Sequence, residues 1–119
     1  MSDYVSVIKY GEWVGVSFSC EHEKPFAIGE KMNEINEMAY MNGYNWDALF
    51  NYCLSENAPE LLEGLDSDPE AGSYTAYYKL SEENEDKANR FAEFIESLVE
   101  NEDELYRIVR ENGDEIEWD

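Results

Sequence analysis

Basic residues are scarce in this chain: eight Lys and Arg stand against 29 Asp and Glu in 119 residues, a formal net charge of −21. Proteins that bind nucleic acid or anionic lipids use Lys and Arg to displace counterions from phosphates, so this balance excludes direct binding to DNA, RNA or membranes. The same charge attracts cationic surfaces and speeds association with them. A plainer interpretation is that the acidic surface only keeps the protein soluble.

Cysteine pairs, long apolar runs and a secretion signal are also missing. Cys20 and Cys53 form no Cys-x-x-Cys motif and are too few for a disulfide scaffold, so both are expected to be reduced thiols. No run approaches the ~20 apolar residues that span a bilayer, and the first residues lack the basic and apolar regions of a secretion signal. We therefore expect a cytoplasmic protein.

Motifs for catalysis and metal binding are absent as well. The sequence holds no nucleophile elbow, phosphate loop, dinucleotide fingerprint or paired-histidine zinc motif. His22 is the only histidine, and with Cys20 it supplies two ligands where zinc needs three or four. Residues 66–77 resemble the start of a calcium loop, but Ala71 and Tyr77 stand where Gly and Glu are required. We expect no metal, no cofactor and no enzyme activity.

Aromatic residues, in contrast, are plentiful. They make up 14% of the chain, with nine Tyr and three Trp, far above the level of a disordered acidic tail. A chain of this length buries roughly two-thirds of its unfolded surface and folds without disulfides or metal. No repeat or linker interrupts it, so we expect a single domain over 1–119.

The first twenty residues predict a β-hairpin. Strand-forming residues alternate over 4–10 and again over 13–19, and Gly11-Glu12 supplies a two-residue turn. Gly15 in the second strand indicates a bulge or a close contact. The side chains expected in the core are Val5, Val7, Val14, Val16 and Phe18.

Apolar residues recurring every three or four positions predict helices after the hairpin. The first is expected over 26–41, and the Asn-Gly pair at 42–43 resembles its C-terminal cap. Asn45 begins the second helix, whose apolar stripe places Cys53 in the core. Residues 59–65 form a short third helix that starts with proline.

The second half of the chain is expected to contain one strand and two helices. Residues 66–72 have loop chemistry, whereas 73–79 alternate with aromatics on both faces, which predicts a strand inside the sheet. Ser81 caps a long amphipathic helix, and Asn101 caps a last helix that Gly113 closes.

This order of elements predicts an α+β fold. A mostly antiparallel sheet would contain the hairpin and the central strand, and about five helices would cover it. Residues 114–119 are expected either to add a short C-terminal strand or to form a free tail.

One segment of the sequence is similar to a known family. The residues Met-Asn-Gly-Tyr-Asn-Trp-Asp-Ala-Leu at 41–49, Ala-Pro-Glu-Leu at 58–61, and Asp-Pro-Glu at 68–70 before an aromatic strand resemble the immunity protein 51 family of bacterial polymorphic toxin systems. The resemblance covers mainly 41–78. It implies a cytoplasmic antidote that binds and blocks a toxin domain, an inhibitor and not an enzyme. The motif residues Gly43, Tyr44, Trp46 and Pro69 are expected to be structural.

The charge and the resemblance together lead to a functional hypothesis. A toxin that cuts nucleic acid presents a basic cleft, which a strongly acidic partner can fill. Two regions compete as the toxin contact: the acidic loop with its neighbouring tyrosines is the one expected, and the acidic face of the last two helices is the alternative. The first comprises Asp66, Asp68, Glu70, Tyr74 and Tyr77. The second comprises Glu82, Glu83, Glu93, Glu96, Glu100 and Glu104.

Two other classes remain open on the sequence alone. A DNA mimic that inhibits a nuclease or a DNA-binding protein would share the charge but would bind many basic proteins. A small acidic enzyme would need a pocket with a perturbed acid or base, which no motif announces.

Overall fold

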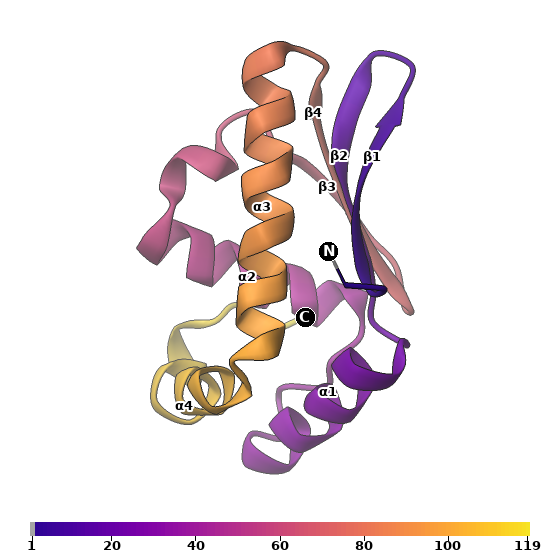
Figure 1. The fold of residues 1–119 in the computed structure, drawn as a ribbon. Helices are drawn as coiled ribbons and strands as arrows, with labels where there is room; N and C mark the ends of the chain where they lie inside the picture. Colours follow the sequence, from indigo (N-terminus) through magenta and orange to yellow (C-terminus); the bar gives the residue numbers. More distant parts are fainter. Residues whose placement is uncertain (1) are drawn as a thin grey trace.

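The computed structural model describes residues 2–119 as a four-stranded antiparallel sheet with four α-helices (Figure 1). In chain order the elements are β1 (Val5–Tyr10), β2 (Trp13–Ser19), α1 (Glu23–Ile35), α2 (Gly43–Asn57), the 3₁₀ turn η1 (Pro59–Leu62), β3 (Asp66–Pro69), β4 (Ser73–Lys79), α3 (Glu82–Glu100), α4 (Glu102–Asn112) and the 3₁₀ turn η2 (Gly113–Glu115). The α+β class is as predicted. The count of about five helices is wrong, because the expected third helix is only the single 3₁₀ turn η1.

The sheet has the order β1-β2-β4-β3. The predicted hairpin is confirmed, and β4 lies inside the sheet between β2 and β3, also as predicted. The expected loop over 66–72 is wrong in its first half, because 66–69 form the edge strand β3. Asp and Pro are poor strand formers, and it is pairing with β4 that holds this segment extended. A short edge strand of this composition also protects the sheet from pairing with other chains.

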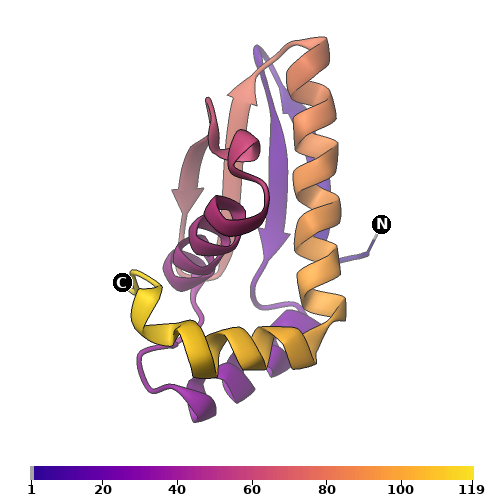
Figure 2. The ribbon, with the colours of Figure 1, turned by 90° about the vertical axis from the view of Figure 1, so that its left-hand side faces the viewer.

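Helices cover only one face of the sheet (Figures 1 and 2). Helix α3 runs along β1 and β2, and α2 packs beside it against β3 and β4. Helices α1 and α4 lie against each other at one end of this layer. The opposite face of the sheet carries no helix among the described residues (Figure 1).

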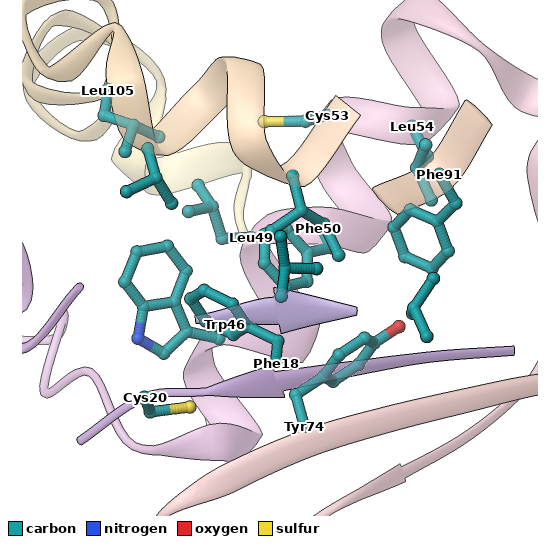
Figure 3. Close-up of a cluster of buried hydrophobic side chains, with 14 of the residues drawn as sticks. Phe18, Cys20, Trp46, Leu49, Phe50, Cys53, Leu54, Tyr74, Phe91 and Leu105 are labelled. Carbon is teal, nitrogen blue, oxygen red and sulfur yellow. The ribbon is translucent and has the colours of Figure 1, made fainter. Parts of the chain in front are cut away.

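Aromatic rings fill the space between the sheet and the helices (Figure 3). Phe18 of β2 contacts Trp46 and Phe50 of α2, with ring centroids 5.0 and 5.5 Å apart. Phe50 also meets Tyr74 of β4 and Phe91 of α3, at 5.1 and 6.1 Å. These edge-on pairs connect the sheet to both α2 and α3, and they stabilise the core beyond the area they bury. Cys20 and Cys53 are free and buried, and burial raises the pKa of each thiol to about 12.

The boundary between α1 and α2 differs from the prediction. Helix α1 ends at Ile35 and not at residue 41, because Asn36 is extended. The pair at 42–43 begins α2 instead of ending α1: the Asn42 side chain accepts a hydrogen bond from the Asn45 backbone N–H at 3.0 Å. Gly43 follows because a Cβ there would overlap the Glu70 and Ser73 carbonyl oxygens. Asn at a helix start and Gly at a helix end are both common, and only the tertiary contact distinguishes them.

The C-terminal residues form neither the strand nor the free tail expected for them. After η2, Ile116 is buried and the Trp118 indole N–H donates to the Gly113 carbonyl at 3.0 Å. The Asp119 backbone N–H donates to the Asn45 side-chain oxygen at 2.6 Å. This segment is therefore held against the start of α2.

Candidate functional site

The open face of the sheet presents side chains that strand alternation turns away from the helices. Val14, Val16 and Phe18 of β2 are buried under the helices, so Trp13, Gly15 and Ser17 belong to the open face. Three rows of cross-strand neighbours follow from the register. They are Tyr10–Trp13–Lys79 at the hairpin tip, Ile8–Gly15–Tyr77–Asp66 next to it, and Ser6–Ser17–Thr75–Asp68 beyond.

Apolar side chains of the first two rows surround a shallow hollow of about 710 Å³. We call it the aromatic hollow; it is lined by Ile8, Lys9, Tyr10, Trp13, Asp66 and Tyr77. Tyr10 is 81% exposed and Trp13 39% exposed, although both are large and hydrophobic. Exposed rings gathered in this way are typical of a surface that binds a partner.

Gly15 lies in the second of these rows, between Ile8 and Tyr77, and is buried. A Cβ at this position would overlap the Ala76 carbonyl oxygen of the adjacent strand, so only glycine fits. The close contact predicted from the sequence is confirmed, and the register continues through it without a bulge.

Charged groups frame the hollow unevenly. Asp66 and Asp68 stand on the β3 edge of the open face, both exposed. Lys79 is the neighbour of Trp13 at the tip. Lys9 forms an ion pair with Glu85 of α3, which directs its ammonium toward the helix layer. The cross-strand row through the hollow therefore carries a carboxylate, that of Asp66, at its β3 end.

The first predicted contact region is only partly brought together. Asp66 and Tyr77 are direct register partners, and Asp68 and the exposed Glu70 follow along the same edge. Tyr74 faces the other way: it is completely buried among the core rings. Its hydroxyl has no hydrogen-bond partner among residues 2–119, and burial raises its pKa well above the usual value. Tyr74 cannot contact a partner directly.

The second predicted region, on α3 and α4, has only half of its six carboxylates free of hydrogen-bond partners among the described residues. Glu82, Glu83 and Glu93 are exposed. The other three acids are engaged within the protein, as the following hydrogen bonds show. Glu96 accepts the Ser2 backbone N–H at 2.6 Å, Glu100 accepts Lys24 Nζ at 2.8 Å and the Tyr4 hydroxyl at 2.6 Å, and Glu104 accepts Arg107 Nε at 3.0 Å. These partners lower the pKa of all three carboxyls.

The four motif residues occupy different environments. Gly43 packs against the β3–β4 turn and Trp46 is fully buried, as structural residues would be. Pro69 is half-buried opposite Tyr74 in the sheet. Tyr44 is exposed on the first turn of α2 and lines another recess.

That recess, of about 490 Å³, lies between α2 and the C-terminal segment. Its acids are Asp47, Glu115, Glu117 and Asp119. Burial raises the pKa of Asp47, while hydrogen bonds from Ser67 and Asn51 lower it in part. Among residues 2–119 no group of three or more His, Cys, Asp or Glu side chains is placed to hold a metal ion.

Ile8, Tyr10 and Trp13 were not anticipated as site residues. A signal for two of them is nevertheless present in the sequence, because Ile8 and Trp13 alternate against the valines of the core. On an open sheet face such positions are usually polar. The sequence does not reveal that helices leave this face uncovered.

An exposed aromatic hollow on a strongly acidic domain defines a surface suited to binding a basic protein. In the part of the chain that the structure describes, no helix is long and apolar enough to cross a membrane. The family model of Immunity protein 51 matches residues 7–114, and the chain belongs to this family. The resemblance is confirmed, and it extends over nearly the whole fold instead of 41–78 alone.

Neither the curated proteins nor the solved structures include one that matches the chain. Family membership indicates an immunity role with a toxin as the partner. It implies an inhibitor and not an enzyme.

Proposed function

We propose that this protein binds a cognate toxin domain in the cytoplasm and neutralises it, and that the toxin is a nuclease with a basic cleft. Family membership carries the immunity role. The net charge of −21 supports the nuclease part of the proposal, because a cleft that holds phosphates is lined with Lys and Arg. An acidic inhibitor that occupies such a cleft excludes the nucleic acid.

Electrostatic steering gives this inhibitor a high association rate. Opposite fields on the two proteins raise the on-rate well above the level of neutral partners, and salt screens the effect. A cell that receives a toxin needs rapid capture, since damage accumulates until the complex forms. The dispersed acids contribute to the rate without each having to contact the toxin.

Lasting affinity requires buried contacts as well as charge. The open sheet face is the stronger candidate for these contacts, because it combines exposed rings with Asp66 and Asp68. The face of α3 mixes its acids with Lys87 and Arg90, and Arg90 pairs with Glu60 at 2.8 Å. We therefore place the toxin contact on the open face, with Asp66, Asp68, Glu70 and Tyr77 from the first predicted region.

Growth rescue tests the immunity role. The toxin domain encoded beside this gene is induced with and without the protein, and the two chains are then co-purified across a salt series. Rescue with a one-to-one complex whose affinity falls as salt rises is the expected result. Tight binding independent of salt would refute the steering mechanism and leave shape and apolar contacts to explain recognition.

The selectivity of binding distinguishes an immunity protein from the alternative, a DNA mimic. An immunity protein retains its own toxin from a mixture of basic proteins, whereas a DNA mimic retains many of them. Failure to rescue growth, combined with broad retention of basic proteins, would favour the mimic.

A further inference from the structure

The aromatic hollow has the chemistry of a site for one flat cation. Trp13, Tyr10 and Tyr77 supply ring faces and edges, Ile8 supplies an apolar wall, and Asp66 supplies a carboxylate. Cations are attracted to the faces of Trp and Tyr, most strongly to Trp. The protein already makes such contacts with its own lysines: Lys31 lies 5.8 Å from the Tyr106 ring centre and Lys87 lies 5.6 Å from that of Tyr78.

The net charge of the whole molecule indicates which kind of partner binds the aromatic hollow. A second copy of this chain also carries a net charge of −21, so electrostatic repulsion opposes self-association through this face. A basic partner is attracted to it instead. Lys79 beside Trp13 reduces the local attraction, Lys9 is paired with Glu85, and Asp66 and Asp68 lie at the β3 edge of the same face.

Arginine suits the hollow better than lysine. Its guanidinium is planar, sheds water more easily than an ammonium, stacks on aromatic rings and pairs with a carboxylate through two parallel N–H groups. The hollow offers each of these contacts, since Trp13 and Tyr77 supply the rings and Asp66 the carboxylate.

We infer that the aromatic hollow is the receptor for an arginine side chain of the toxin, which stacks on Trp13 and Tyr77 and pairs with Asp66. The identity of the partner rests on the proposed function, whereas the preference of the hollow for a guanidinium does not. Insertion of one arginine anchors the toxin over the open face and removes that positive charge from its substrate site.

A titration without any toxin tests the hollow itself. N-acetyl-arginine amide is added to ¹⁵N-labelled protein, and the indole N–H signal of Trp13, assigned with Trp13→Phe, is followed by NMR. Saturable shifts with a dissociation constant on the order of millimolar are expected. The fully buried Trp46 provides an internal control. N-acetyl-citrulline amide, which has the same shape without the charge, should bind several-fold more weakly.

Matched variants locate the carboxylate. Asp66→Asn should weaken binding of the arginine probe about three- to tenfold, the range expected for a partly exposed charged hydrogen bond. Asp103→Asn removes the same charge from an exposed position of α4, at the end of the molecule away from the hairpin tip. It should leave the affinity within about twofold, since exposed charges separated by more than a Debye length are largely screened. The inference would be overturned if arginine and citrulline bound equally well, or if the two variants had equal effects. It would also be overturned if the Trp13 signal did not shift even at probe concentrations well above the millimolar range.

A second experiment uses the toxin domain encoded beside the gene. Trp13→Ala should raise its dissociation rate tenfold or more, as truncation of a central aromatic anchor does. Phe26→Ala removes a ring that is 51% exposed on α1 and should leave the rate within about twofold. If the unaltered protein does not bind the toxin, the proposed function fails. The arginine titration still tests whether the hollow prefers a guanidinium. If it binds and Trp13→Ala dissociates no faster, the inference alone fails.

Discussion

Gly15 shows how a single residue ties the fold to the candidate site. The adjacent strand approaches so closely that a Cβ would overlap the Ala76 carbonyl oxygen. Its cross-strand neighbours on the open face are Ile8 and Tyr77, two of the residues that line the hollow. The pairing of the strands that carry the hollow therefore depends on one position.

Gly15→Ala should destabilise the protein by about 1–3 kcal/mol, the usual cost of forcing an extra methyl into a tightly packed site. Urea denaturation followed by circular dichroism measures the change. Ser97→Ala, at an exposed position of α3, is the control and should stay within about 0.5 kcal/mol. A Gly15→Ala protein as stable as the unaltered one would show that β2 and β4 can separate without cost.

Asp47 gives a prediction about pH. Burial raises its pKa in the folded state, so folding favours the protonated carboxyl over the ionised one. Its contribution to stability is therefore greatest below the pKa of the unfolded chain and declines as pH rises through the folded pKa. Asp47→Asn, which cannot ionise, should raise the Tm at pH 7.

The gain from Asp47→Asn should shrink as the pH is lowered toward 4, near the ordinary pKa of Asp. Thermal melts of both proteins over this range measure it. Glu37→Gln, at an exposed position, is the matched control for the loss of one charge. A gain for Asp47→Asn that does not vary with pH would contradict the role of burial.

At the scale of elements, helix starts show which local signals act as the sequence suggests. Ser81 caps α3 as predicted, its hydroxyl accepting the Asn84 backbone N–H at 3.0 Å. Asn101 stands at the corresponding position of α4, but its side chain makes no capping bond. The two helices thus begin with equally suitable residues, of which only one is used.

Ser81→Ala should cost about 1 kcal/mol, the typical value of a lost N-terminal cap. Asn101→Ala should cost less, because no side-chain bond is lost there. Equilibrium unfolding of the two variants provides the comparison. Equal losses would mean that Asn101 caps α4 in solution or that Ser81 does not cap α3.

Much of the element structure could be read from the sequence. Apolar residues recur every second position in the hairpin and β4 and about every fourth position in α3. These patterns agree with the strand or helix that each segment forms in the fold. The edge strand β3 could not be predicted, because Asp-Ser-Asp-Pro favours a loop and is extended only by pairing with β4. The start of α2 was predicted wrongly because the Asn-Gly pair at 42–43 suits both a helix start and a helix end, and only contacts of Gly43 with the β3–β4 turn decide between them.

At the scale of the whole molecule, the net charge of −21 acts in two opposite directions. It repels like charges within the folded protein and attracts a basic partner. Salt screens both effects, over a Debye length of about 10 Å at 0.1 M.

Raising NaCl from about 0.02 to 0.3 M should therefore increase the Tm of the isolated protein and weaken its toxin complex at the same time. A melting series measures the first change and a binding series the second. Sucrose, which favours folded states without screening charge, serves as a control and should raise the Tm without weakening the complex. A Tm that falls with added NaCl would show that ion pairs such as Lys24–Glu100 outweigh the general repulsion.

Composition and periodicity by themselves determined the acidic character, the α+β class and most of the helices and strands, and the motifs at 41–49, 58–61 and 68–70 carried the resemblance to the immunity family. These properties depend on residue types and on short spacings along the chain. The tertiary structure decided that the helices all lie on one side of the sheet, that Tyr74 is core while Tyr77 is surface, and that Ile8, Trp13 and Asp66 line one hollow. Strands distant in sequence become neighbours only through their pairing, and no local pattern specifies which face of a sheet the helices leave open.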